Sequence, residues 1–206
     1  MDVTIAICTW NRSHLLRETL EAMTRMRAAG IEWELLVVDN NCTDDTSQVI
    51  ASFAQRLPIR GLRESTPGLS AARNTAVAAA RGRHIIWTDD DVLVDDAWLV
   101  EYARAFARWP DAAVFGGPIE PWFDGEPPRW LRDVFPEVSY AYAACDFGNQ
   151  ELGLRDPDRL PYGANMAFLL SAQREAPYDT RIGVRPSSRV GGEETTAIAA
   201  VLQRGY

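Results

Sequence analysis

Val3-Thr-Ile-Ala-Ile-Cys8 is a short apolar, largely β-branched run, and the polar residues 9–13 follow it directly. Leucine and methionine then recur at helical spacing towards Gly30, so the start of the chain predicts a strand, a loop and a helix. The same order repeats, with strands expected at residues 35–39, 59–63 and 84–87 and helices around residues 46–53, 69–81 and 98–106. Strands that alternate with helices favour a three-layer α/β/α sandwich around a mostly parallel sheet.

The 206 residues, of which 47% are hydrophobic, suit one domain with a proper core. After about Gly117 the alternation stops, and prolines and tryptophans become frequent. We therefore expect a single domain over residues 1–206, made of a first half at 1–117 and a second half at 118–206. In the second half, residues 162–168 predict a strand and the residues after Gly192 predict a helix.

The charge of the chain excludes several functions. All 21 basic residues are arginine, so mechanisms that need a lysine are excluded, including Schiff-base enzymes and the P-loop lysine. The net charge of −8 disfavours a nucleic-acid partner. Three cysteines without a C-x-x-C spacing indicate reduced packing residues and neither a disulfide framework nor a zinc site.

The amino end lacks the pattern of a signal peptide, and no stretch is apolar enough to span a bilayer. We expect a soluble, cytoplasmic chain without a transmembrane segment. Peripheral association with the inner face of a membrane stays open, and the oligomeric state is not indicated.

Polar clusters follow three of the expected strands, at residues 9–12, 39–41 and 89–91. In parallel sheets, ligands bind beyond the carboxyl ends of the strands. Chain order therefore predicts that the three clusters share one cleft.

Three adjacent carboxylates, Asp89, Asp90 and Asp91, repel one another unless a cation neutralises them. Aspartate oxygens suit Mg²⁺ or Mn²⁺, and Mg²⁺ typically binds through one or two carboxylates plus substrate phosphates. A solvated acidic helix start is the equally weighted alternative.

Other candidates also have a functional and an ordinary interpretation. Arg73 lies among small residues and could reach an anion, but a lone helix arginine is more often an exposed side chain. Asp39 could bind a base or ribose, or could simply cap a turn. Glu193 and Glu194 could supply a general base, or could stabilise a helix N-terminus. Trp122 could stack on a sugar or pack in a lid.

Six segments, taken together and in this order, resemble the inverting nucleotide-sugar glycosyltransferases of family 2, which have the GT-A fold. They are Thr4-Ile-Ala-Ile-Cys-Thr-Trp-Asn-Arg12, Glu34-Leu-Leu-Val-Val-Asp-Asn-Asn-Cys-Thr-Asp-Asp45, Gly68-Leu-Ser-Ala-Ala-Arg-Asn74, Ile86-Trp-Thr-Asp-Asp-Asp91, Tyr162-Gly-Ala-Asn-Met-Ala-Phe168 and Gly192-Glu-Glu194. The fourth is similar to the D-x-D motif of the family, and the sixth to the Glu-Asp motif of its catalytic base.

The resemblance implies a metal-dependent transfer of sugar from a nucleoside-diphosphate sugar, with a UDP-sugar preferred, to a hydroxyl of a sugar, glycan or lipid-linked acceptor. It implies a role for each candidate residue: nucleotide binding by Thr9, Asn11, Arg12, Asp39, Asn41, Gly68, Arg73, Asp89 and Asp90; Mn²⁺ or Mg²⁺ binding by Asp91 and Asp89; proton abstraction by Glu194 or Glu193; and acceptor contacts by Asn165 and Trp122.

The chain departs from the family pattern in three places. Glu-Glu replaces the frequent Glu-Asp, so the choice between Glu193 and Glu194 stays open, and Leu169 and Leu170 stand where arginines are frequent. The chain stops at Tyr206, so we expect C-terminal elements of relatives to be missing. A non-catalytic nucleotide-binding module is the alternative function, and a nucleotidyltransferase is a weaker one because it usually requires a lysine.

Overall fold

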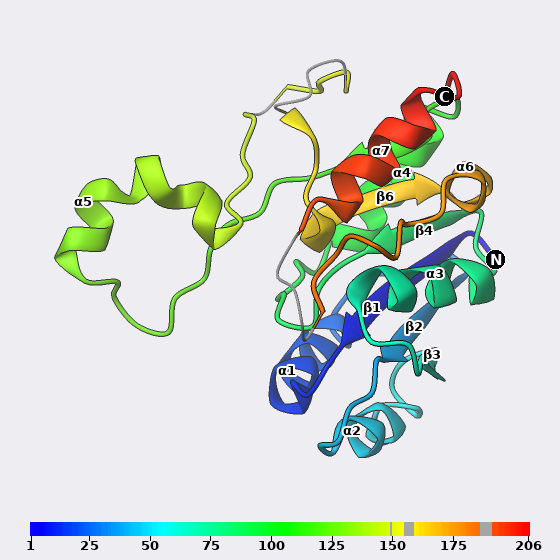
Figure 1. Ribbon diagram of the computed structural model, residues 1–206, viewed down its shortest axis with the longest axis horizontal. Helices are drawn as coiled ribbons and strands as arrows, with labels where there is room; N and C mark the ends of the chain where they lie inside the picture. The colour runs from blue at the N-terminus through cyan, green and yellow to red at the C-terminus, as the bar shows by residue number, and fades with distance from the viewer. Residues whose placement is uncertain (149, 155–158, 186–190) are drawn as a thin grey trace.

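A six-stranded sheet forms the centre of the computed structural model, which describes residues 1–206 except 149, 155–158 and 186–190 (Figure 1). The strands are β1 (Val3–Thr9), β2 (Trp33–Asp39), β3 (Ile59–Arg63), β4 (His84–Trp87), β5 (Val114–Gly116) and β6 (Met166–Leu169). Their order is β3-β2-β1-β4-β6-β5, and all neighbours pair in parallel except β6, which runs antiparallel to β4 and β5. The mostly parallel sheet predicted from the sequence is confirmed.

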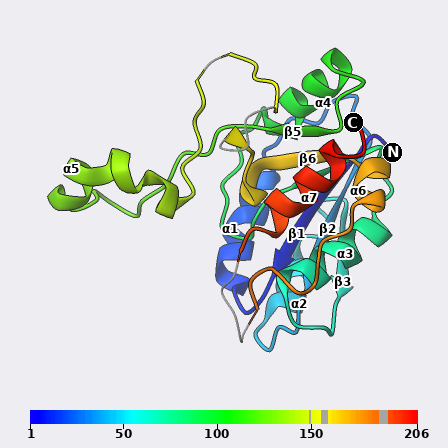
Figure 2. The ribbon, with the colours of Figure 1, turned by 45° about the horizontal axis from the view of Figure 1, so that its top comes forward.

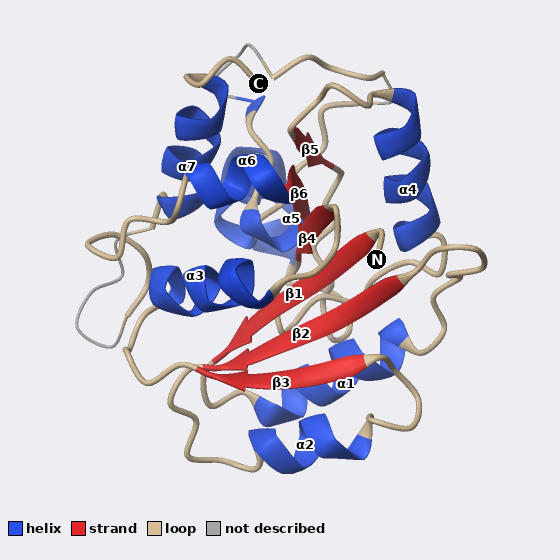
Figure 3. Ribbon diagram, turned by 90° about the vertical axis from the view of Figure 1, so that its right-hand side faces the viewer, coloured by secondary structure: helices blue, strands red, loops and turns tan. Residues whose placement is uncertain are grey.

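Helices cover both faces of the sheet, as Figure 3 shows. One layer contains α1 (Ser13–Met23), α2 (Thr46–Ser52) and α4 (Trp98–Arg108), and the other contains α3 (Leu69–Ala79), α6 (Leu170–Glu175) and α7 (Glu193–Leu202). Alternate residues of each buried strand feed the two apolar cores: Ile5 and Ile7 pack with the first layer, and Ala6 with the second. The predicted three-layer sandwich is therefore confirmed.

Two predicted boundaries move. The helix expected to reach residue 81 ends at Ala79, because Ala80 is extended and Gly82 lies against β1, where a Cβ would be 2.4 Å from the Thr4 nitrogen. The strand expected at 162–168 begins only at Met166, because the short 3₁₀ helix η3 (Gly163–Asn165) precedes it.

A projecting segment, residues 118–147, stands away from the sheet in two views (Figures 1 and 2) and is called the arm below. It contains α5 (Arg129–Val138) and the 3₁₀ helix η1 (Ser139–Tyr142). Phe123, Phe135 and Tyr142 form its aromatic cluster, with ring centroids 5.6 to 5.9 Å apart. Because β5 runs parallel to β4, the arm leaves the sheet at the same edge as the carboxyl ends of β1, β2 and β4.

Across the described part of the chain, no helix is both long and apolar enough to cross a bilayer. Cys8, Cys42 and Cys145 are free thiols, as the cysteine spacing predicted.

Candidate active site

The carboxyl ends of β1, β2 and β4 bring the three predicted polar clusters together. The Thr9 hydroxyl, at the end of β1, donates to Oδ2 of Asp90 at 2.6 Å. Arg12 forms an ion pair with Oδ1 of Asp90 at 2.9 Å and another with Asp91. The loop after β1 is thus joined to the loop after β4, a contact between residues about eighty positions apart in the chain.

The loop after β2 joins the same edge through backbone contacts. Oδ1 of Asn11 accepts from the Thr43 nitrogen at 2.7 Å, and both Asn11 and Asn41 adopt positive φ, which asparagine tolerates better than most residues. Oδ1 of Asp39 accepts from the Cys42 nitrogen at 2.7 Å, so Asp39 does cap a turn.

Gly68 and Asn41 connect this edge to α3. The Gly68 nitrogen donates to Oδ1 of Asn40 at 2.8 Å, and φ of +131° at Gly68 requires glycine. Nδ2 of Asn41 donates to the Ser65 carbonyl at 2.9 Å. Both residues therefore shape the loops beyond the carboxyl ends of the strands through their backbones and short polar contacts.

Asp89 differs from its two neighbours because it has no hydrogen bond or ion pair to any other described residue. Burial raises its pKa, although the positive charge of Arg73 acts in the opposite direction. Asp90 is 2% exposed, and burial raises its pKa to about 6 despite the hydrogen bond from Thr9. Asp91 is exposed to solvent. The triplet therefore contains one structural acid, Asp90, flanked by two acids with accessible or unpartnered oxygens.

These two flanking acids fit a hard divalent ion only in part. Within the described residues, no group of three or more His, Cys, Asp or Glu side chains could hold a metal ion. Asp89 and Asp91 supply the one or two carboxylates through which Mg²⁺ commonly binds when substrate phosphates complete its coordination. The donor set thus fits an ion that is shared with a bound diphosphate.

Arg73 lies inside the molecule and not on the surface of α3. Its side chain is 4% exposed, and its Nη1 contacts Oε1 of Glu193 at 2.8 Å and Oε2 of Glu194 at 3.8 Å. The guanidinium lies over the rings of Trp87 and Tyr178, with its Cζ 5.7 and 5.2 Å from their centroids. The interpretation of Arg73 as an exposed helix residue is therefore wrong.

Glu193 and Glu194 begin α7 and face the same arginine, but their environments differ. The Glu193 side chain is 3% exposed and bonded to Arg73, whereas the Glu194 side chain is 24% exposed. Burial and the charge of Glu194 raise the pKa of Glu193, and Arg73 opposes the rise. The helix does return to the sheet edge, as a catalytic role of this loop requires.

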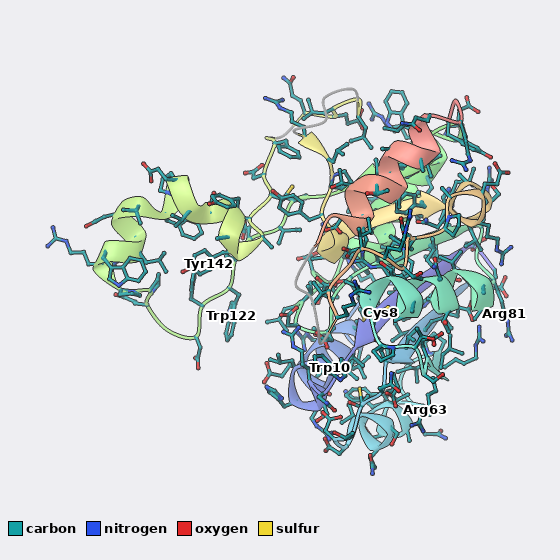
Figure 4. All side chains as sticks on the ribbon, viewed as in Figure 1. Cys8, Trp10, Arg63, Arg81, Trp122 and Tyr142 are labelled. Atoms are coloured by element: carbon teal, nitrogen blue, oxygen red, sulfur yellow. The ribbon has the colours of Figure 1, made fainter. Side chains whose placement is uncertain are left out.

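The two predicted acceptor residues lie in contrasting places. Asn165 is 8% exposed: its Oδ1 accepts from Trp98 and Tyr102, and its Nδ2 donates to the Pro118 carbonyl, all at 2.8 to 2.9 Å. All three contacts are internal, so Asn165 ties α4 to the base of the arm. Trp122 is 69% exposed on the arm, whereas Trp10 and Cys8 belong to the body (Figure 4).

Sequence reasoning missed the polar contacts by which α3 anchors the second half of the chain. The Ser70 hydroxyl donates to the Ile182 carbonyl at 2.6 Å, and the Asn74 amide exchanges two hydrogen bonds of 2.9 Å with the backbone of Tyr178. Ser70, Arg73 and Asn74 recur at helical spacing in an otherwise small and apolar helix. That spacing is a signal for one polar face, but it does not identify the partners.

Comparison of the sequence with known protein families identifies the family of the chain. Residues 4–169 match the family described as glycosyl transferase family 2. The chain belongs to this family. The match includes the three strand-end clusters, α3 and η3, and it ends before α7.

The curated relatives of this family 2 chain include glycosyltransferases of several kinds. Chondroitin synthase of Escherichia coli is 25% identical over 116 residues, which are 55% of this chain and 17% of that protein. Validoxylamine A glucosyltransferase of Streptomyces hygroscopicus subsp. limoneus is 29% identical over 117 residues, 56% of this chain and 26% of that protein. The matched part of the chain spans 12 to 27% of the length of such relatives.

Solved structures share the fold. A fragment of TarS from Staphylococcus aureus has a TM-score of 0.73 at 17% identity and covers 98% of this chain and 56% of that one. The mannosyltransferase PcManGT of Pyrobaculum calidifontis, solved with GDP-Man and Mn²⁺, has a TM-score of 0.71 at 21% identity and covers 99% and 52%. These likenesses show that the family 2 chain has the GT-A fold of glycosyltransferases.

Proposed function

We propose that the chain is a metal-dependent inverting glycosyltransferase, which moves a sugar from a nucleoside-diphosphate sugar to a hydroxyl of a saccharide or lipid-linked acceptor. The observation that carries the proposal is that Asp89 lies close enough to Asp91 and to Glu194 for their charges to interact, in a family 2 chain. Solved relatives of this fold contain UDP-GlcNAc, GDP-Man with Mn²⁺, and UDP-Glc with Mn²⁺. We take a UDP-sugar as the first donor to test.

The loops after β1 and β2 bind the nucleotide in this proposal. The carboxylate of Asp39 accepts from the base or ribose, while Asn11, Asn41 and Gly68 keep the loops in place. Arg12 has a side chain that is 42% exposed beside Asp91, so its guanidinium can reach a phosphate oxygen. Thr9 contributes indirectly, because its hydroxyl is bonded to Asp90.

Asp89 and Asp91 would hold Mn²⁺ or Mg²⁺ together with the diphosphate. The ion, when bound, supplies positive charge that stabilises the departing diphosphate. Arg12 now pairs with Asp91, so ion binding and phosphate binding both require Arg12 to turn from this carboxylate. The chemistry of the chain's own residues is therefore to bind the donor and to orient its leaving group.

Glu194 is the base that we propose. Its side chain is 24% exposed, and its Oε2 has no hydrogen-bond partner among the described residues, whereas Glu193 is bonded to Arg73. The carboxylate accepts the proton of the acceptor hydroxyl while that oxygen forms a bond to the anomeric carbon. The bond from this carbon to the diphosphate oxygen breaks on the opposite face, and its electron pair leaves with the nucleoside diphosphate, which inverts the anomeric configuration.

Calorimetric titration tests the donor half of the proposal. The chain is titrated with UDP, GDP and dTDP, each with and without Mn²⁺, and the experiment is repeated on Asp91→Asn. We expect one nucleotide to bind in a Mn²⁺-dependent manner and Asp91→Asn to weaken it strongly. Asp111→Asn is the matched control, because Asp111 is an exposed acid before β5, at the opposite edge of the sheet.

Product analysis tests the reaction itself. Release of nucleoside diphosphate with sugar transfer supports the proposal, whereas release of pyrophosphate indicates a nucleotidyltransferase. Nucleotide binding without turnover of any donor would identify a non-catalytic binding module. No nucleotide binding at all would contradict both the enzyme and the binding module.

A further inference from the structure

A cavity lies at the amino ends of β1 and β4, away from the candidate active site at the carboxyl ends of these strands. Its volume is about 280 Å³, and its lining comes from β1, β4, α4 and the loops before the strands: Asp2, Val3, Gly30, Ile31, Arg83, His84, Ala103, Phe106 and Ala107. Figure 4 shows how far apart the two ends lie, because Arg81, shortly before β4, and Trp10, directly after β1, are on opposite sides of the body.

His84 is the buried polar side chain of this cavity. It is 6% exposed, and its ring stacks on Phe106 with centroids 3.8 Å apart. Neither ring nitrogen has a hydrogen bond to a described residue, yet neither is fully enclosed by protein, so the nitrogens are open to the cavity that the residue lines. Burial, together with the charge of Arg83, lowers the pKa of His84 to about 4, so the ring is neutral near pH 7. A neutral imidazole has one N–H donor and one acceptor nitrogen, and buried polar groups nearly always have a partner. The ring is therefore suited to a partner from outside the chain.

Arg83 supplies the positive charge of the cavity. Its side chain is exposed and forms no hydrogen bond or ion pair with any other described residue. It lies close enough to His84 for its charge to act on the ring. A guanidinium presents its N–H donors in a planar fork that matches the two oxygens of a carboxylate. A free cation and an unpartnered neutral ring thus face the same cavity.

The remaining lining restricts the charge and the polarity of a ligand. Asp2 is the one acid of the lining, and its Oδ2 accepts from the Glu32 nitrogen at 2.8 Å. The charge of Asp2 repels an anion, and the repulsion is greater for a doubly charged phosphate monoester than for a singly charged carboxylate. Val3, Ile31 and Phe106 contribute apolar surface, which favours a ligand with a hydrocarbon body.

We propose that this cavity binds a small organic monocarboxylate. Arg83 donates to the carboxylate oxygens, His84 donates one further hydrogen bond through its ring N–H, and the apolar lining covers the hydrocarbon body. The site is separate from the donor and acceptor sites of the proposed glycosyltransferase, and ligand binding there does not depend on that activity.

Arg83 also lines a second cavity, which is the competing location for an anion. That cavity has a volume of about 410 Å³ and is lined by Gly82, Arg83, Leu169, Leu170, Ser171 and Arg174. Its polar side chains, Arg83, Ser171 and Arg174, are all exposed, and Nη2 of Arg174 already donates to the Ala80 carbonyl at 2.8 Å. His84 lines the first cavity, so a ligand in that cavity should perturb the histidine ring directly.

Proton NMR of the histidine rings locates the ligand. The chain has two histidines, and His14, exposed on α1, is the internal reference. Benzoate is the probe: a ligand of this size with one charged contact should have a Kd of about 1 mM, so it is titrated to about 20 mM at pH 7 and constant ionic strength. We expect a saturable shift of the His84 Cε1–H resonance and an unchanged His14 resonance. Benzamide, which has the same shape without the charge, should bind at least about tenfold more weakly.

Three substitutions identify the cation that binds the carboxylate. Arg83→Gln should raise the Kd for benzoate at least about tenfold, because it removes a hydrogen bond to a charged group. Arg81→Gln is the matched control, since it removes an exposed arginine two residues earlier that lines neither cavity, and it should leave the Kd unchanged. Arg174→Gln should also leave the Kd unchanged. All three arginines are exposed, so none of these variants should disturb folding.

Absence of a saturable His84 shift, or equal weakening by Arg83→Gln and Arg81→Gln, would overturn the inference. Weakening by Arg174→Gln as large as that by Arg83→Gln would place the anion in the second cavity and would also overturn it. Equal affinity for benzoate and benzamide would show that the charge is not recognised. Tighter binding of inorganic phosphate than of benzoate, measured by the same His84 shift, would contradict the proposed class of ligand.

Discussion

At the scale of single residues, the pair at the start of α7 provides the most direct test of the chemistry. Glu194→Gln keeps the shape of the side chain but cannot accept a proton, so we expect kcat to fall by about 10²–10⁴-fold with little change in donor KM. Steady-state rates with the donor identified by calorimetry measure this loss. Glu18→Gln, which neutralises an exposed acid of α1, is the control and should keep the wild-type rate. A wild-type kcat in Glu194→Gln would remove this residue from the mechanism.

Adding a side chain at Gly163 should lower the stability of the fold. A methyl group there would lie 2.3 Å from Nη2 of Arg73, so Gly163→Ala must displace the buried guanidinium and should cost about 1–3 kcal/mol of unfolding free energy. Urea unfolding followed by circular dichroism gives the value. Gly153→Ala is the matched control, because no atom of the described residues lies within 4 Å of a Cβ at that position. Equal stability of the two variants would show that Arg73 has room to move.

The strand-end residues were predictable because parallel strands share an edge. Periodicity alone located Thr9, Asp39 and Asp91 at the ends of apolar runs, and the sheet topology then had to bring them together. The partner of Arg73 was not predictable in this way. Its ion pair with Glu193 joins residues 120 positions apart in the chain. The spacing of residues near Arg73 does not indicate which later helix packs against α3.

At the scale of elements, the long periodic segments were predicted and the short or proline-rich ones were not. Strand β5 has three residues, and α6 has six, so neither shows enough of a period to be identified. Helix α5 contains Pro136 and buries only Leu131 among its described side chains, so its sequence resembles a loop. Strand β6 was expected, but its antiparallel direction depends on the path of the arm before it.

The side-chain amide of Asn165 joins η3, α4 and the base of the arm, so its replacement should lower the free energy of unfolding. Asn165→Asp retains an acceptor for Trp98 and Tyr102 but replaces the donor to the Pro118 carbonyl with an oxygen. The loss of one hydrogen bond and the repulsion between two buried acceptors should cost about 2–3 kcal/mol of unfolding free energy. Chemical denaturation measures it, with Gln55→Glu, the same change of amide to acid at an exposed residue, as the control. An unchanged midpoint would mean that Pro118 has another donor.

Replacement of Trp122 on the arm should affect the use of the acceptor without changing the stability of the fold. Trp122 is 69% exposed, so Trp122→Ala should change the unfolding free energy by no more than about 0.5 kcal/mol. Because the arm leaves the sheet at the edge of the candidate active site, we expect the same variant to weaken acceptor use and to leave calorimetric nucleotide binding unchanged. Trp109→Ala, at an exposed tryptophan after α4, is the control. Equal acceptor KM in both variants would remove Trp122 from the acceptor side.

At the scale of the whole molecule, the two ends of the parallel strands differ: the candidate active site lies at their carboxyl ends, and residues with structural contacts lie at their amino ends. The carboxyl ends of the parallel strands contain the acids and arginines of the candidate active site. The opposite ends contain buried polar residues that make internal contacts, such as Glu34, which accepts from Thr4 and Arg60. Substitutions at the two edges should therefore act on different measurements: on activity at one edge and on unfolding at the other.

His84, at the amino end of β4, makes the unfolding free energy depend on pH. Its ring stacks on Phe106 with centroids 3.8 Å apart, and burial, together with the charge of Arg83, lowers its pKa to about 4. In the unfolded chain, the histidine has a pKa of about 6.5 and binds a proton below that pH. In the folded chain, His84 binds this proton only below about pH 4. The free energy of unfolding therefore falls as the pH decreases from about 6.5 to about 4. Between about pH 7.5 and about pH 5.5 the loss should be about 1 kcal/mol from this one group.

His84→Phe keeps an aromatic ring against Phe106 and removes the titration, so urea unfolding at the two pH values should show a smaller loss for this variant than for the wild type. Buried acids such as Asp90, with its pKa raised to about 6, act in the opposite direction, but they are common to both proteins and cancel in the difference. His14→Gln removes the exposed histidine of α1 and should retain the wild-type dependence. If His84→Phe and the wild type lose equal stability, His84 is protonated as readily in the folded chain as in the unfolded one, and its burial against Phe106 has no electrostatic cost.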